Sequence, residues 1–166
     1  MAGQIQQVYI NATRFGHQSV TLKGETAEQF GSVPFTIPRG ALSAINWEAA
    51  QDIGEVQGNR IQSVGVTDGY GTATGDHEML VSEADDWVKT VTGNGQYPLM
   101  SVFFNFLLIY SVNQGIDVRR VRIVGARIKN VSAGSQRGND AATNRYQWRA
   151  GQVFVNGIAM YGDPAT

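Results

Sequence analysis

Residues 82–91, with the sequence SEADDWVKTV, form the one segment of this 166-residue chain that has a clear helical pattern. An apolar stripe recurs at helical spacing on one side of the segment: Ala84, Trp87, Val88 and Val91. Ser82 and Asp85 approximate a capping box, in which a serine oxygen and an acidic side chain three residues later bind free backbone N–H groups. Gly93-Asn94-Gly95 supplies a C-terminal stop. We therefore expect a helix of about three turns that lies on a sheet.

The segments on both sides of this helix have strand patterns. Residues 74–81 alternate with a period of two, and residues 101–110 are apolar on both faces, with Asn105 as the polar exception. An apolar run of this kind is typical of a strand that is covered on both faces. We expect residues 101–110 to form a central strand, with the core on one face and the helix or a neighbouring molecule on the other.

The pattern of the first 49 residues predicts strands over residues 5–11, 18–24 and 42–49. Residues 25–40 contain two prolines and two glycines, which favour a long loop. The apolar residues of that loop need burial, either in the subunit's own core or against a partner: Phe30, Val33, Phe35 and Ile37. Residues 54–69 are punctuated by glycines and too polar for a core, so we expect an extended, projecting hairpin or loop there.

A change of phase marks the strand pattern over residues 119–131. Val121 and Ile123 are apolar at odd positions, whereas Val124, Ala126 and Ile128 are apolar at even positions. Because a slip of one residue exchanges the two faces of a strand, a bulge or bend is expected near Gly125. A strand bent there can serve two sheets. Residues 145–150 and 153–155 complete the predicted strands.

The composition favours a single β-rich domain, residues 1–166, with no catalytic equipment. The chain has 20 glycines, 16% charged residues, no cysteine and a formal net charge of −1. A dedicated nucleic-acid binder carries excess Lys and Arg, and the absence of cysteine excludes disulfides and thiolate sites. The N-terminus lacks a signal-peptide pattern, and the longest apolar run is about half of a membrane span. We expect a protein with no cofactor and no membrane association.

Motifs for catalysis or phosphate binding fail on spacing. His17 and His77 show no zinc-ligand spacing and are best interpreted as ordinary surface or strand histidines. Residues 69–75 are glycine-rich but lead into a strand, whereas a dinucleotide loop must open a helix. A basic cluster could contact phosphates, but a solvated or subunit-facing strand explains it more simply: Arg119, Arg120, Arg122, Arg127 and Lys129. The sequence contains no candidate catalytic residue.

Two segments together resemble the phage tail tube family, which shares its fold with the haemolysin-coregulated protein of type VI secretion. The first runs from Ile45-Asn46-Trp47 through the glycine-bordered residues 54–71 to the Met-containing residues 75–81, just before the acidic helix. The second is residues 124–131 followed by the small polar turn of residues 134–141. The order of these motifs around one helix carries the resemblance, which covers roughly residues 42–160. Residues 1–41 show no pattern of this family.

The resemblance implies a mainly β fold of two packed antiparallel sheets, a sandwich or distorted barrel, with one flanking helix. It further implies a non-enzymatic subunit of the virion tail that is assembled in the host cytoplasm. Six copies would form a ring, and the rings would stack into a channel for DNA ejection. Its main partner would be itself, with tail sheath, tape measure, baseplate and terminator proteins as further partners. DNA would pass without specific binding, because rows of Lys and Arg in the lumen would hold the phosphates.

Two sets of residues are the candidate sites. The inter-ring or subunit contact is expected at Gly54, Glu55, Val56, Gln57, Gly58, Asn59, Arg60 and Gln62. The lumen is expected to be lined by Glu48, Asp76 and Glu78, on alternating strand positions.

Two alternatives stay open at this point. One is another ring-forming relative, such as a type VI secretion-like tube subunit or a tail completion or baseplate protein. The other is a β-sandwich carbohydrate-binding module, whose signature would be an exposed aromatic platform. The candidates for that platform are Tyr70, Tyr97, Tyr110, Tyr146, Trp148 and Tyr161.

Overall fold

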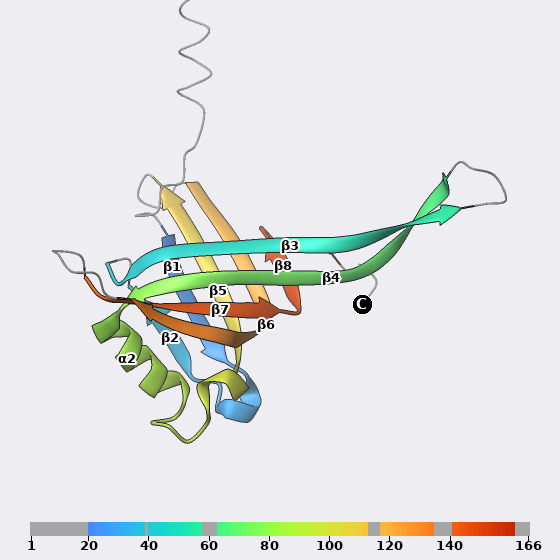
Figure 1. Ribbon diagram of the computed structural model, residues 1–166. Helices are drawn as coiled ribbons and strands as arrows, with labels where there is room; N and C mark the ends of the chain where they lie inside the picture. Colours follow the sequence, from blue (N-terminus) through green and yellow to red (C-terminus); the bar gives the residue numbers. More distant parts are fainter. Residues whose placement is uncertain (1–19, 39, 58–62, 113–116, 135–140, 162–166) are drawn as a thin grey trace, which may run out of the picture.

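The computed structural model describes residues 20–38, 40–57, 63–112, 117–134 and 141–161 (Figure 1). The strands are β1 (Val20–Thr26), β2 (Pro34–Ile37), β3 (Leu42–Gln57), β4 (Ser63–Leu80), β5 (Phe103–Val112), β6 (Asp117–Gly134), β7 (Thr143–Ala150), β8 (Gln152–Val155) and β9 (Ile158–Ala159). One α-helix, α2 (Val81–Val91), and two short 3-10 turns, η2 (Glu28–Phe30) and η3 (Leu99–Ser101), complete the described elements. The mainly β class with one flanking helix is as expected.

The strands form a single antiparallel sheet that folds over on itself, instead of two separate sheets. The order is β2-β1-β5-β6-β7-β4-β3, and β8 pairs with β6 and β9. Strand β6 joins two halves, because its residues 121–124 pair with β8 while its residues 127–134 pair with β7. In Figure 1, β3, β4 and β7 cross in front of β1 and β5.

The fold-over occurs at Gly125, where the phase change predicted a bulge. The pairing of β5 with β6 shifts register between Phe104 and Phe106, and Gly125 adopts a φ of +67°. A non-glycine residue is strained at such a φ. The Gly125 amide donates to Asn105 Oδ1 over 3.1 Å, and the Gly151 amide donates to the Val124 carbonyl oxygen over 3.1 Å. These bonds fix the corner at which β6 passes from one half to the other.

The core lies between the two halves and is rich in aromatic rings. Phe106 on β5 approaches His77 on β4 and Trp148 on β7, with ring centroids 5.8 and 5.7 Å apart. Trp87 of α2 stacks on Phe104, with centroids 5.7 Å apart. The helix therefore closes one end of the space between the halves, as the apolar stripe predicted: Ala84, Trp87 and Val91 are buried and Val88 is partly buried.

The start of α2 differs from the prediction. The helix begins at Val81 with Leu80 as N-cap, and no side chain caps it, so the expected capping box at Ser82 is wrong. Instead, β4 leads directly into the helix: the Leu80 amide donates to Ala41 and the Val81 amide to Ala142. The end is as expected, because Gly93 has a φ of +60° immediately after the last turn.

The prediction of a loop over residues 25–40 is wrong in its centre. β1 reaches Thr26, η2 follows, and β2 pairs with β1 so that Glu25 lies opposite Pro34. Phe35 and Ile37 are buried in the subunit's own core. Residues 54–57 and 63–69, expected as a projecting hairpin or loop, are paired strand continuations of β3 and β4, in agreement with the hairpin. The strand predicted over residues 5–11 lies outside the described residues.

Among the described residues, strand β5 is fully covered on one face only. Phe104, Phe106 and Leu108 are buried, whereas Leu107 and Ile109 on the opposite face are half-buried. The helix packs against β2, β4 and β7, not against this outer face of β5. No described element of the chain covers this outer face fully.

Candidate functional site

The outer surface of β3, β4 and β7 is a continuous polar face. The register places Asn46, Asp76 and Gln147 in one row across the three strands, and Ala44, Glu78 and Arg145 in the adjacent row. Glu48, Thr74 and Arg149 form a third row. Because side chains directly opposite one another share a face, we call this surface, formed by the three rows, the polar face. It carries all three residues expected in the lumen.

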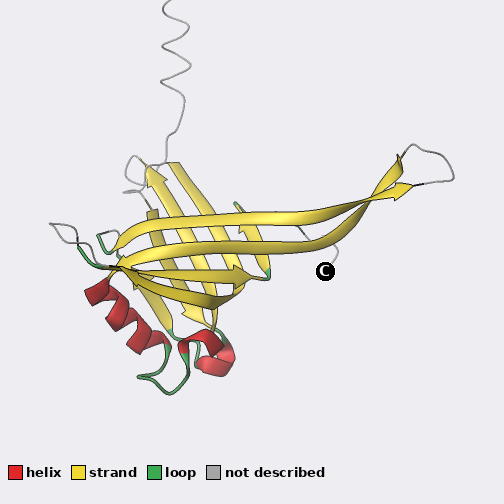
Figure 2. Ribbon diagram, in the orientation of Figure 1, coloured by secondary structure: helices red, strands yellow, loops and turns green. Residues whose placement is uncertain are grey.

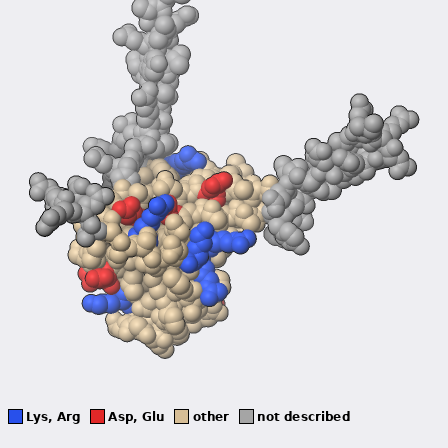
Figure 3. Space-filling view, viewed as in Figure 1, with Lys and Arg blue, Asp and Glu red and all other residues tan. Residues whose placement is uncertain are grey.

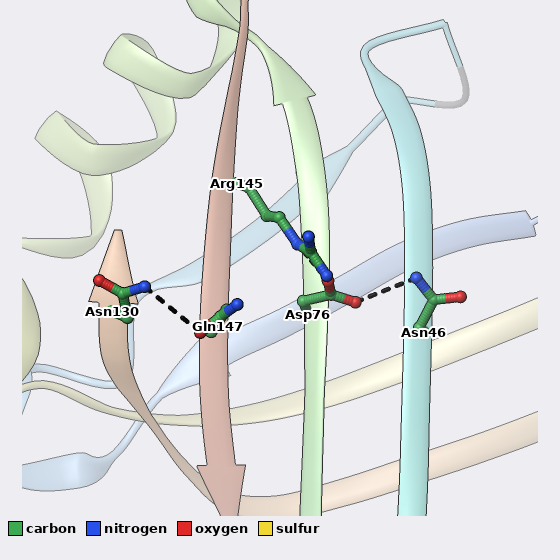
Figure 4. Close-up of polar contacts among 5 residues, drawn as sticks. All are labelled: Asn46, Asp76, Asn130, Arg145 and Gln147. Carbon is green, nitrogen blue, oxygen red and sulfur yellow. Dashed lines mark hydrogen bonds and ion pairs between the residues drawn. The ribbon is translucent and has the colours of Figure 1, made fainter. Parts of the chain in front are cut away.

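Asp76 is the centre of a hydrogen-bonded network on the polar face (Figure 4). Its Oδ2 accepts from Arg145 in an ion pair, and its Oδ1 accepts from Asn46 Nδ2 over 3.0 Å. Asp76 is 7% exposed, whereas the Arg145 side chain is half exposed. The network ties three strands together side by side, and solvent screens the exposed part of the ion pair.

A second group of contacts extends the network toward the helix and β6. Glu78 Oε1 accepts from Thr143 Oγ1, and Asn130 Nδ2 donates to Gln147 Oε1 over 3.3 Å. An open depression of about 330 Å³ lies over the network and includes Lys129 and Glu48 in its lining. Hydrogen bonds therefore link residues of the two rows that contain Asp76 and Glu78 to one another and to Thr143 and Asn130.

The polar face carries both signs of charge, which the sequence reasoning missed. Arg145, Arg149 and Lys129 lie beside the three acids, and Figure 3 shows basic and acidic side chains interspersed over this side of the molecule. The alternation of Arg145, Gln147 and Arg149 along β7 was the sequence signal that could have placed them there. The surface that carries Glu48, Asp76 and Glu78 is therefore mixed in charge.

The outer ends of β3 and β4 project from the body as an arm, which we define as residues 53–57 and 63–68. Figure 2 shows this part of the hairpin as strand that continues past the rest of the sheet. Pairs such as Gly54 with Thr67 and Val56 with Gly65 hold the two strands together. Of the residues expected to contact another subunit, Gly54, Glu55, Val56 and Gln57 lie on this arm. Gly58, Asn59, Arg60 and Gln62 lie outside the described residues.

Among the described side chains, which do not include that of Tyr70, there is no metal site and no ligand-binding aromatic platform. Within residues 20–161 as described, no group of three His, Asp or Glu side chains could hold a metal ion. Tyr146 and Trp148 are buried in the core, at 2% and 1% exposure, and Tyr161 is also buried. Tyr97 and Tyr110 are partly buried. In the described chain, no helix is long and apolar enough to cross a membrane.

His77 is a core residue, with 1% exposure. Its ring stacks on Tyr146 at 5.2 Å, and neither ring nitrogen has a hydrogen-bond partner. Burial lowers the pKa of His77 from 6.5 to about 3, although the adjacent Asp76 carboxylate acts in the opposite direction. The imidazole is therefore neutral at physiological pH and contributes packing, not chemistry.

Comparison with known proteins gives similarity in structure but not in sequence. No protein-family profile matches the chain, and no curated protein matches it. A chain of the sheath-tube complex of an extracellular contractile injection system is 12% identical with a TM-score of 0.61, over 90% of this chain and 95% of that one. A chain of the sheath/tube terminator of such a system is 12% identical with a TM-score of 0.63, over 87% and 98%.

A phage protein shows the same likeness. The SPP1 tail tube is 11% identical with a TM-score of 0.58, and the match covers 86% of this chain and 78% of that one. At such low identity the likeness concerns the fold alone. The chain therefore has the phage tail-tube-like fold, which it shares with proteins of contractile injection systems.

Proposed function

We propose that this chain is a non-enzymatic structural subunit of a virion tail, which assembles with copies of itself into stacked rings around a channel. The observation that supports this most directly is the combination of a tail-tube-like fold with a long arm that projects from the body. A two-stranded ribbon has little stability alone in water. An arm of this kind is best explained by contacts with another molecule.

The edges of the folded sheet favour association within a ring. Among the described residues, β3 pairs only with β4, and β2 pairs only with β1, so each of these strands has one open edge. Open edges expose backbone N–H and C=O groups that can pair with another chain. A head-to-tail contact between two different edges closes into a ring when the rotation allows it. We infer that neighbouring subunits, six in the expected ring, cover these edges.

The polar face is the surface that we assign to the lumen. Its rows are mostly polar, and Asp76 at its centre is hydrogen-bonded to Asn46, whereas the outer face of β5 and β8 carries half-buried Leu107, Ile109 and Phe154. A water-filled channel suits the former, and contact with protein suits the latter. The basic residues do not form an unbroken row, because Arg145 is paired with Asp76. DNA would pass this surface without being held.

Replacement of the outer end of the arm tests the role of the arm in the stacking of rings. A variant with Glu55 to Asn59 replaced by a short Gly-Ser turn should remain a soluble folded subunit by circular dichroism and light scattering, but should no longer form filaments. The matched control is Lys89→Ala, on the exposed surface of α2, which should form filaments like the parent. Normal tubes from the arm variant would refute the role of the arm in stacking.

The second candidate is a single-ring component with the same fold, such as a tube terminator or baseplate protein. The likeness to a terminator chain, with a TM-score of 0.63, favours it. Electron microscopy of the purified parent protein separates the two, because a tube subunit forms long filaments and a terminator forms single rings.

A further inference from the structure

The last described residue, Tyr161, returns to the body of the protein at the base of the arm. Tyr161 follows β9 and is 7% exposed. Its ring lies directly against the backbone of β4 at Gly71: a Cβ atom on Gly71 would lie 1.8 Å from Tyr161 Cδ2. No side chain other than hydrogen fits between the ring and the strand, so the contact requires glycine at position 71.

Hydrogen bonds attach Tyr161 to the corner of the sheet. Its phenol Oη donates to the Gly151 carbonyl oxygen over 2.8 Å, and Gln152 Nε2 donates to the Tyr161 carbonyl oxygen over 2.5 Å. The Gly151 amide in turn donates to Val124, beside the bend of β6. Burial raises the pKa of the Tyr161 phenol, so the group remains a hydrogen-bond donor at neutral pH. One face of the ring thus contacts the base of the arm while its hydroxyl is bound to the most constrained part of the sheet.

The position of Gly71 gives this contact its significance. Gly71 pairs with Gln51, and the next pair of the ladder is Ile53 with Asp68, so the register shifts immediately beyond Gly71. Such irregularities bend a strand and change its direction. Figure 1 shows β3 and β4 curving away from the body in this region. The direction of the arm is therefore decided within a few residues of the Tyr161 ring.

We propose that Tyr161 is a positioning residue that holds the base of the arm against the corner of the sheet and so aims the arm at a second copy of this chain. The inference rests on the proposed function, because the arm's partner is a subunit of the next ring. Without the contact between the Tyr161 side chain and Gly71, the arm would sample several directions. Only the subunits whose arm points at the partner would then be able to assemble. If the arm points at the partner for only about a tenth of the time, assembly requires a protein concentration about tenfold higher than that of the parent.

The direction of the arm can be measured in single subunits. Because the chain has no cysteine, nitroxide labels can be placed at Gln57→Cys, at the outer end of β3, and at Lys89→Cys, on the exposed side of α2. Pulsed electron spin resonance in dilute solution then gives the distribution of distances between the two labels. The parent should give a narrow distribution, and Tyr161→Ala and Gly71→Ala should each broaden it roughly twofold.

The matched control is Val153→Ala. Val153 is fully buried on β8, so this variant weakens the core while Tyr161 and Gly71 stay in place, and its distribution should be as narrow as that of the parent. Amide hydrogen exchange gives a second readout: Tyr161→Ala should speed exchange in residues 53–57 but not in β5. If Tyr161→Ala also loses protection in β5, the exchange is measured on Tyr161→Phe instead, because this variant removes only the bond to Gly151. Faster exchange in residues 53–57 but not in β5 is again the expected result. Unchanged distance widths and unchanged exchange in the arm would overturn the proposal.

Assembly measurements separate this inference from the proposed function. Filament formation, followed by light scattering, should need about tenfold more Tyr161→Ala protein than parent, and the Val153→Ala variant should match the parent. Assembly of Tyr161→Ala at the parent's concentration would overturn the role of Tyr161 in aiming the arm, even if tubes form. A parent protein that forms no filaments would instead contradict the proposed function. The widths of the distance distributions in single subunits would still test the contact between Tyr161 and Gly71.

Discussion

Mild acidification, from pH 7 to pH 5, should destabilise the folded subunit chiefly through His77. The imidazole is fully buried among aromatic rings, and burial lowers its pKa to about 3, from 6.5 in an unfolded chain. A group whose pKa is depressed on folding takes up protons in the unfolded state first. Its neutral form therefore supports the fold above pH 6.5, and this contribution is lost as the pH falls from 6.5 toward 3.

The size of the effect follows from the two pKa values. Between pH 7 and pH 5, protonation of His77 in the unfolded chain alone should lower the free energy of unfolding by about 2 kcal/mol, since each pKa unit corresponds to about 1.4 kcal/mol. The full difference, roughly 5 kcal/mol, would be reached only below pH 3, where the histidine is protonated in both states. Carboxyl groups as a class have reference pKa values near 4, so the window from pH 7 to pH 5 isolates the histidine best.

A comparison with His77→Leu measures the contribution directly. Leucine has a similar volume and no titratable group, so the free energy of unfolding of this variant should change little between pH 7 and pH 5. Urea unfolding followed by tryptophan fluorescence, under conditions that keep subunits dissociated, gives both values for each protein. The reasoning is refuted if parent and variant lose the same stability over this range.

Three further substitutions test other parts of the structure. Gly75→Ala should lower the free energy of unfolding by about 1–3 kcal/mol in urea unfolding, because the new Cβ would lie 2.4 Å from Trp148; unchanged stability would contradict this packing. Asp76→Asn should cost at most about 1 kcal/mol by the same assay, since the Arg145 partner is half exposed; a loss of several kcal/mol would show a stronger network. Glu48→Arg should leave assembly intact but make tubes retain DNA in low-salt sedimentation, and tubes that still release DNA would argue against a lumen position.

The local features of this fold were accessible from the sequence. The bend at Gly125 was visible as a change of phase, because alternation records which face each side chain occupies. The end of α2 was visible in Gly93, because a helix stop depends on the few residues around it. Alternation also placed Glu48, Asp76 and Glu78 on one face of their strands. Each of these signals is carried by a short stretch of chain.

Features decided by distant partners were not accessible. The start of α2 at Val81 is one such feature, because the Leu80 and Val81 amides donate to backbone oxygens of the distant Ala41 and Ala142. Pro34 suggested a loop, but proline is tolerated in an edge strand, and β2 is such an edge. The contact of Tyr161 with Gly71 joins residues 90 positions apart, and nothing in either local pattern announces it.

The central claim is that copies of this chain stack into tubes, and negative-stain electron microscopy of the purified full-length protein over a range of concentrations tests it most directly. The account predicts hollow filaments built of regularly stacked rings, which disappear when the tip of the arm is replaced. Folded protein that remains monomeric, or stops at single rings, at every concentration would contradict the tube assignment.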